Sequence, residues 1–197
     1  MSLAQHVHKM SNRELIGIAK NRFIDEDTQL EIARHRYLRA RQYLCENPSI
    51  TESVIDEMVA GKAWSCKLIL CGNGHLDNRQ DDIRTLYNKI PSTMKQPWRI
   101  MNCFLKPYWR TTQGRETAWI NTPSDVIDQI YNDKYSGLSL RHSKHASWYL
   151  ENAMTVLINH PNTSDSVLLS ISQKSELPKH ASLALLKVSE RRRDANI

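Results

Sequence analysis

The sequence predicts an all-α protein, folded as a right-handed α-solenoid of about five helix-turn-helix repeats. Apolar residues recur at helical spacing, as in Val54, Ile55 and Met58. An asparagine closes an apolar run three times, 26 residues apart, and a lysine-led tetrapeptide opens another apolar run three times. Such recurrence is typical of stacked helical repeats, and an irregular helical bundle with similar turns is the alternative. The asparagines are Asn21, Asn47 and Asn73, and the tetrapeptides begin at Lys62, Lys144 and Lys179.

Each repeat is expected to contain a short helix A, a turn and a helix B, and to end at an asparagine or a His-Pro break. The five repeats cover residues 11–46, 47–72, 73–118, 119–159 and 160–190. Helix A of the second, fourth and fifth repeats is expected to start at a hydroxyl cap, namely Thr51, Ser124 and Ser164. The third repeat has a long connection at residues 90–97, and the fourth has one around Ser136 and Gly137.

The whole chain of 197 residues is expected to form a single domain, with a loose cap at residues 1–10 and a frayed basic end at 189–197. With 40% hydrophobic and 24% charged residues, a packed core is expected and general disorder is excluded. No run of apolar residues is long enough for a membrane span, so no membrane partner is expected. Four scattered cysteines and a start unlike a secretory signal favour a cytoplasmic location.

The repeat signature resembles those of known α-solenoid families. The segment from Asn47 to Ile55, with Pro48 and the hydroxyl residues Ser49 and Thr51, is similar to the leucine-rich-repeat variant signature, and the chain also resembles HEAT-like repeat proteins. The resemblance covers most of the chain and is clearest in the second and fifth repeats. It implies an α-solenoid whose B helices line the concave surface, and it implies no particular activity.

Charge is sorted between the two kinds of helix. The predicted A helices contain 13 of the 21 acidic residues, whereas the B helices are rich in lysine and arginine. The chain has 27 basic residues and a net charge of +6, which favours an acidic partner. The window from Ile83 to Arg115 has seven basic residues and no acidic one, with tryptophan and tyrosine between them. Basic and aromatic residues together are typical of single-stranded nucleic-acid binding, because bases stack on rings while cations hold phosphates.

These features predict a non-catalytic module that captures DNA or RNA in a basic groove lined by the second helix of each repeat. The alternative is a protein-binding adaptor or inhibitor, whose groove holds an acidic peptide or a partner helix. Eleven residues are predicted to contact the nucleic acid. They are Arg36, Arg39, Lys67, Lys95, Trp98, Arg99, Lys106, Trp109, Arg110, Arg115 and Lys144.

No cofactor, metal or catalytic residue is predicted. The spacings Cys66-x4-Cys71 and His142-x2-His145 match no recognised four-ligand metal site. His145 and His180 occupy equivalent repeat positions, which indicates a shared structural role rather than one catalytic base. HEAT-like DNA glycosylases use a Trp, an Asp and an Arg in a basic groove. The residues of this chain that invite comparison do not match that motif residue by residue; they are Trp98, Trp109, Trp119 and Asp125.

Overall fold

The computed structural model describes residues 3–105, 107–109, 117–137 and 144–195. This part of the chain is helical, as predicted, apart from one small sheet of two three-residue strands, β1 (Pro107–Trp109) and β2 (Thr117–Trp119). Among these residues, none of the helices combines the length and the apolar character that crossing a bilayer requires. The chain divides into two compact units, Met1–Asp82 with Tyr108–Ala118, and Ile83–Pro107 with Trp119–Ile197.

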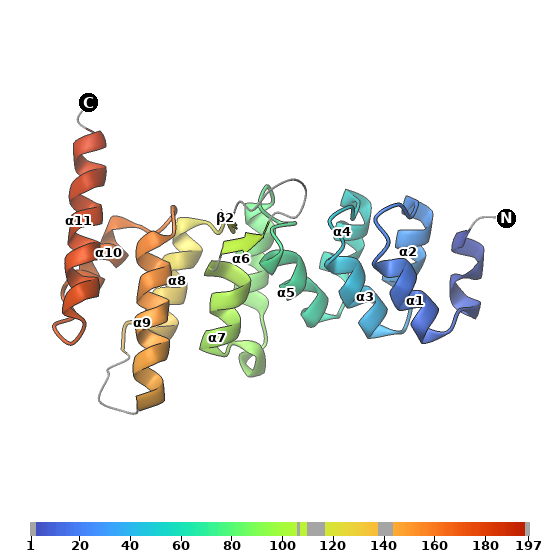
Figure 1. Cartoon of the computed structure of the whole chain (residues 1–197), viewed down its shortest axis with the longest axis horizontal. Coiled ribbons are helices and arrows are strands. Elements are labelled where there is room, and N and C mark those ends of the chain that lie inside the picture. The colour runs from blue at the N-terminus through green and yellow to red at the C-terminus, as the bar shows by residue number, and fades with distance from the viewer. Residues whose placement is uncertain (1–2, 106, 110–116, 138–143, 196–197) are drawn as a thin grey trace. The chain divides into compact units, whose positions relative to one another are not determined.

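The first unit consists of two rows of short helices. The first-helix row contains the 3-10 helix η1 (Leu3–Lys9), α2 (Glu26–Arg34) and α4 (Glu52–Ala60), packed in that order. The second-helix row contains α1 (Asn12–Ala19), α3 (Leu38–Cys45) and α5 (Trp64–Gly72), which lie side by side in Figure 1. Buried aliphatic residues on facing sides, such as Ile32, Leu44 and Leu70, form the core between the rows.

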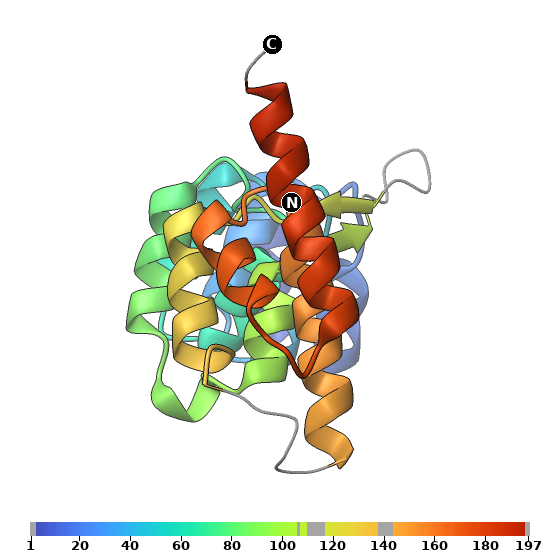
Figure 2. The ribbon, with the colours of Figure 1, turned by 90° about the vertical axis from the view of Figure 1, so that its left-hand side faces the viewer.

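The second unit begins within α6 (Gln80–Lys89), followed by the 3-10 turn η2 (Ser92–Met94), α7 (Pro97–Ile100) and the π-helical turn η3 (Met101–Leu105). The helices α8 (Ser124–Lys134), α9 (Lys144–Asn159), α10 (Asp165–Ser172) and α11 (Pro178–Asp194) complete it. Helix α9 packs against η3, α10 and α11, and Figure 2 shows α11 alongside α9. The edge-to-face contact between Tyr87 and Phe104, both fully buried, anchors α6 to η3.

The observed helices follow one another as α2 and α3, α4 and α5, α6 and α7 with η3, α8 and α9, and α10 and α11. Of these successive helices, α2 packs on α3, α4 on α5 and α10 on α11. Two elements differ from the prediction. The first predicted repeat contains an additional helix, α1, and the third contains the strands β1 and β2.

Both predicted chain ends also differ from the structure. Within residues 1–10 the helix η1 packs on α2 and buries Val7 completely. At the other end, α11 continues to Asp194 beyond the predicted helix end at residue 188. Arg191 holds this part of α11 in place, because its guanidinium donates to the carbonyl oxygens of Thr163 and Pro161 and lies 3.3 Å from an Asp165 oxygen.

Buried side chains at the ends of the second helices join consecutive pairs. Asn47, which is 2% exposed, donates from Nδ2 to the carbonyl oxygens of Ala19 and Asn21, at 2.9 Å each. Its Oδ1 accepts the backbone N–H of Ser49 at 3.0 Å. Asn73 repeats the link one pair later, with a longer bond of 3.5 Å to the Cys45 carbonyl oxygen. The 26-residue spacing of Asn47 and Asn73 therefore has a structural cause, since each of these two donates to a backbone carbonyl oxygen at the end of an earlier helix. Asn21 differs, because its side chain accepts the nearby Phe23 N–H.

In the second unit a histidine takes the place of the asparagine. His160 is fully buried, and its Nε2 donates to the Ile120 carbonyl oxygen at 3.0 Å while its Nδ1 accepts the Asn162 N–H at 3.1 Å. Its ring also packs edge-to-face on Trp119, with centroids 5.4 Å apart. The His-Pro break at residues 160–161 therefore has the same structural role as the Asn-Pro break at residues 47–48.

Candidate nucleic-acid interface

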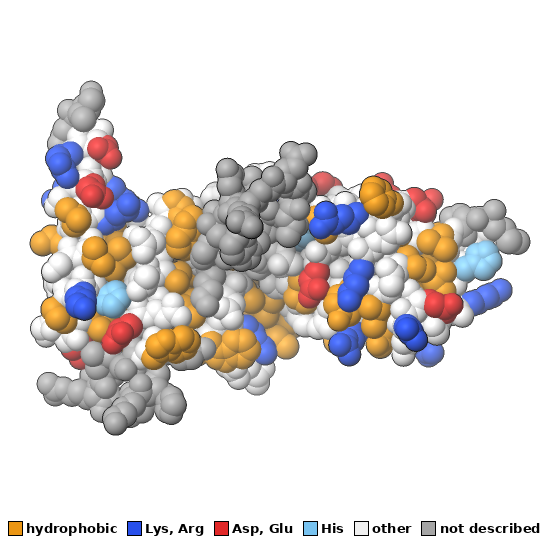
Figure 3. Space-filling model, in the orientation of Figure 1, with side chains coloured by type: hydrophobic (Ala, Val, Ile, Leu, Met, Phe, Trp, Pro, Cys, Tyr) orange, Lys and Arg blue, Asp and Glu red, His pale blue; other side chains and the backbone are white. Residues whose placement is uncertain are grey.

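In the first unit the two rows of helices have opposite charge. The helices α2 and α4 together contain six acidic residues and one arginine. The helices α1, α3 and α5 contain four basic residues, Arg13, Arg39, Arg41 and Lys67, and one acidic residue, Glu14. Lysine and arginine side chains gather over α1, α3 and α5 on the face shown in Figure 3. This face of the first unit therefore favours an anionic partner.

Basic groups on this face lie over aromatic rings. The Nζ of Lys20, at the C-terminal end of α1, is 4.0 Å from the ring centroid of Tyr43 on α3. Arg39 lies 5.9 Å from the same ring, and the Nζ of Lys67 lies 4.9 Å from the Trp64 ring on α5. Tyr43 and Trp64 are half-buried, so their positions are fixed by packing while part of each ring stays accessible. We define Lys20, Arg39, Tyr43, Trp64 and Lys67 as the ring–cation face.

The acidic groups of the opposite row are engaged in contacts between helices. Glu57 of α4 accepts two hydrogen bonds from Arg34 of α2, at 3.1 and 3.2 Å. Arg79 binds Asp56 at 2.6 Å and lies 3.6 Å from Glu52. In contrast, neither Lys20 nor Arg39 forms an ion pair with an acidic residue in the described part of the chain.

Arg39 remains a cation at any physiological pH. A hydrogen bond with Tyr43 is the main cause that raises the pKa of this guanidinium above its ordinary value. Arg39 and Lys20 are both exposed. A phosphate that approaches Lys20 and Arg39 therefore meets exposed cationic groups that form no ion pair with a carboxylate in the described part of the chain.

The predicted residues of the first unit fall in different elements. Arg39 and Lys67 lie on α3 and α5, as predicted for helix B residues. Arg36 does not lie on a helix. It lies in the bend between α2 and α3, where it is exposed. That bend forms because the His35 Nδ1 accepts the backbone N–H of Tyr37, so α3 starts only at Leu38.

In the second unit the structure brings Trp98 and Arg99 together. The Arg99 guanidinium lies 5.1 Å from the centroid of the Trp98 ring, which is 40% exposed. Lys95 is half-buried in the connection before α7 rather than on a helix, and its Nζ lies 4.9 Å from the Tyr87 ring. Tyr87 is fully buried and donates its hydroxyl to Asp133 at 3.0 Å.

Of the other predicted contact residues, three lie outside the described residues, namely Lys106, Arg110 and Arg115. Trp109 is the last residue of β1 and Lys144 is the first residue of α9.

Sequence reasoning missed Lys20, Tyr43 and Trp64. Arg39 and Tyr43 are four residues apart, and Trp64 and Lys67 are three apart, so each pair lies on one face of a helix. This spacing could have predicted both contacts between a cation and a ring. Lys20 contacts Tyr43 across 23 residues of sequence, and no local pattern predicts that contact.

The residues considered for catalysis are held in structural contacts. Asp125 accepts hydrogen bonds from Arg84 at 2.9 and 3.2 Å, and this contact is the main cause that lowers its pKa. His180 Nε2 lies 3.0 Å from the Thr155 hydroxyl. Cys45 and Cys66 are buried, and the contact with the Cys66 thiol is the main cause that raises the pKa of Cys45. Within the described ranges, no three His, Cys, Asp or Glu side chains are grouped so as to hold a metal ion.

Comparison with known proteins adds no assignment to this geometry. No protein-family model matches the chain, and neither the curated proteins nor the solved structures include one that is significantly similar to it.

Proposed function

We propose that the protein is a non-catalytic module that binds single-stranded nucleic acid on the ring–cation face of its first unit. The observation that carries the proposal is the placement of Lys20, Arg39 and Lys67 over the rings of Tyr43 and Trp64, on the row of helices with the fewest acids. An unpaired base stacks on such a ring, and a neighbouring ammonium or guanidinium holds the phosphate of the same nucleotide.

The second unit offers one further pair of the same kind, Trp98 with Arg99. The exposed part of the Trp98 ring is available for a base, and Arg99 for a phosphate. In this proposal the two units each contribute contacts to nucleic acid, and the first unit contributes more of them.

We also propose that the helical pairs are repeats of a right-handed, HEAT-like α-solenoid. The equivalent roles of Asn47 and His160 support this proposal, because both bond to a carbonyl oxygen of the preceding pair and both accept the backbone N–H two residues later. Contacts between the segments that precede α8 and α10 support it too. Asn162 donates to Asn121, and His160 packs on Trp119.

The test is fluorescence anisotropy with a labelled single-stranded oligonucleotide, on the full chain and on the double variant Lys20→Glu, Arg39→Glu. Loss of two phosphate contacts of about 1 kcal/mol each predicts binding about 30-fold weaker. The double variant Lys89→Glu, Lys179→Glu is the matched control, since it makes the same change in net charge at two exposed positions of the second unit. Equal loss in both variants, or none in the first, contradicts the assignment of this face.

A second candidate function, protein binding, is favoured by a different observation. Leu183 and Leu186, one turn apart on the same face of α11, are each more than half exposed, at 53% and 52%. Adjacent exposed leucines on one helix face are unusual on a surface that faces only water and are typical of sites of protein association.

A further inference from the structure

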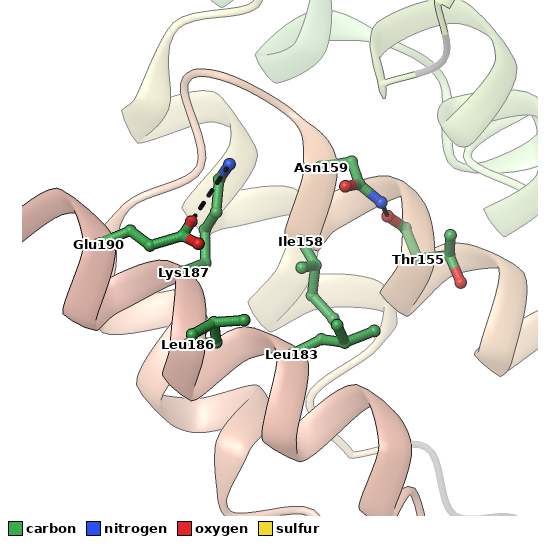
Figure 4. A pocket seen from close by; sticks show the side chains of 7 residues that line it. All are labelled: Thr155, Ile158, Asn159, Leu183, Leu186, Lys187 and Glu190. Atoms are coloured by element: carbon green, nitrogen blue, oxygen red, sulfur yellow. Dashed lines mark hydrogen bonds and ion pairs between the residues drawn. The ribbon is translucent and has the colours of Figure 1, made fainter.

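A pocket of about 230 Å³, lined by three apolar and four polar or charged residues, lies between α9 and α11 in the second unit. Figure 4 shows its lining, with Ile158 of α9 facing Leu183 of α11 and Leu186 one turn further along α11. Ile158 is buried, so it forms the floor, whereas Leu183 and Leu186 form an exposed wall. Trp148 precedes Thr155 by two helical turns on the same face of α9 and is 62% exposed, but the exposed side chain of Glu151 lies between it and the pocket.

Thr155 and Asn159, the polar residues that α9 contributes to this pocket, already have hydrogen-bond partners within the protein. The Thr155 hydroxyl donates its only proton to the Glu151 carbonyl oxygen at 2.9 Å. It therefore acts as the acceptor in its contact with His180, whose Nε2–H donates to it. Asn159 donates from Nδ2 to the Thr155 carbonyl oxygen at 2.8 Å. An occupant therefore need not supply hydrogen bonds to these two residues, and its contact surface is expected to be apolar.

Charge along α11 indicates the chemistry of the occupant. This helix contains five lysines and arginines against two acidic residues. Lys187, at the end of the pocket, makes one long ion pair of 4.0 Å with Glu190, and both side chains are more than 40% exposed. A pair this long and exposed is weak, so a carboxylate from a partner can replace Glu190 at low cost.

We propose that the groove between α9 and α11 binds an acidic amphipathic helix of another protein. Apolar side chains at positions i, i+3 and i+7 of that helix fill the pocket beside Leu183 and Leu186, and its carboxylates reach Lys187. Leu183 and Leu186 are themselves one turn apart on α11, so the wall that they form runs along the helix, parallel to such a stripe. This inference rests on the second candidate function and does not depend on nucleic-acid binding by the first unit.

The test uses two labelled synthetic peptides of about 20 residues with the same leucine stripe at helical spacing, one with glutamate and one with lysine at the polar positions. The acidic peptide is expected to bind with a Kd in the micromolar range, and the basic peptide at least about tenfold more weakly. Failure of the acidic peptide to bind, or equal binding of both, overturns the proposal.

The chain offers a matched pair of variants. Leu186→Arg places a charge in the pocket and is expected to abolish binding of the acidic peptide. Leu185→Arg is the control, because Leu185 is equally exposed but does not line the pocket. Circular dichroism checks the fold of both variants. If Leu186→Arg unfolds the protein, Lys187→Glu is the second variant, and it is expected to weaken binding of the acidic peptide about tenfold. Equal effects of Leu186→Arg and Leu185→Arg contradict the proposal.

Two further measurements distinguish the alternatives. The Lys20→Glu, Arg39→Glu variant is expected to bind the acidic peptide as well as the unmodified chain does, and a loss there assigns the peptide to the ring–cation face instead. Sedimentation shows whether a second copy of the chain occupies the groove. A dimer that Leu186→Arg converts to a monomer overturns the proposal in favour of self-association.

Discussion

Asn47 and His160 show how different side chains can perform one structural task. Each is buried, each precedes a proline, and each donates to a backbone carbonyl oxygen while accepting the N–H two residues later. Asparagine does so with its amide at any pH, because the amide does not titrate. Histidine does so only as the neutral ring, because its Nδ1 must be unprotonated to accept.

His160 therefore makes the stability of the protein depend on pH. Burial is the main cause that lowers its pKa to about 4, from an ordinary value of 6.5. Because the unfolded chain takes up this proton first, the stabilising contribution is complete above pH 6.5 and is lost as the pH falls from 6.5 to about 4. The shift corresponds to about 3 kcal/mol of unfolding free energy.

The measurement is chemical denaturation of the unmodified chain and of His160→Asn at pH 7 and pH 4. The variant carries the residue that performs the same task at position 47, and it does not titrate. All other groups are shared, so the fall in unfolding free energy between the two pH values is expected to be about 3 kcal/mol smaller in the variant. The same fall in both proteins would show that His160 is not held in its neutral form.

The helices differ in how their N-termini are satisfied. In the first-helix row Asp25 caps α2 by accepting the Thr28 N–H at 2.8 Å, which also lowers the pKa of Asp25. In the second-helix row Ser11 caps α1, but the N-cap residues of α3 and α5 are Tyr37 and Ala63, and neither of these side chains accepts a backbone N–H. An acidic cap on α5 would place a negative charge one turn from Lys67. The missing cap is therefore consistent with a surface that binds an anion.

Two substitutions at the start of α5 separate stability from binding. Ala63→Asp and Ala63→Ser each supply the missing acceptor and are expected to raise the unfolding free energy by about 1 kcal/mol. Only Ala63→Asp adds a negative charge near Lys67, and it is expected to weaken oligonucleotide binding about threefold at low salt. Denaturation and anisotropy on both variants are the measurements. Equal affinity of the two variants would contradict a phosphate contact at this end of α5.

The helical pairs could be predicted from sequence because helical spacing and punctuation are local. Caps were predicted less well. Ser164 caps α10 as predicted, but the Thr51 hydroxyl bonds to Glu26 of the neighbouring helix instead of its own backbone, and Ser124 lies inside α8, whose N-cap is Pro123. A hydroxyl near a helix start has several acceptors within reach, and the tertiary neighbour decides among them.

The ring–cation face could be predicted only in part, because some of its residues follow from local patterns and others from packing between helices. Arg39 and Lys67 follow from charge sorting along the chain, which is a local property. The contribution of Lys20 follows only from the packing of α1 on α3, which brings residues 23 positions apart into contact. The strands β1 and β2 interrupt a segment that the repeat pattern assigned to helix, and nothing in the repeat pattern signals them.

At the scale of the whole molecule, the net charge of +6 is less informative than its distribution. Most acidic residues in the first-helix row are used in contacts between helices, so the acidic charge there contributes to the fold. Lys20 and Arg39 of the ring–cation face form no ion pair with an acidic residue among the described residues, and the basic residues of α1, α3 and α5 are concentrated at one surface. Such a surface attracts a polyanion by releasing counterions from it.

This distribution predicts both the salt dependence of binding and the preference for single strands. Three phosphate contacts, by Lys20, Arg39 and Lys67, give a slope of about −2 for log K against log salt with a single strand. A single strand is expected to bind at least about tenfold tighter than a duplex of the same sequence, because only unpaired bases can stack on Tyr43 and Trp64. Anisotropy with both oligonucleotides across a salt series is the measurement. A duplex that binds equally well, with a steeper slope, would mean that the face holds phosphates alone and that its rings serve only to position the cations.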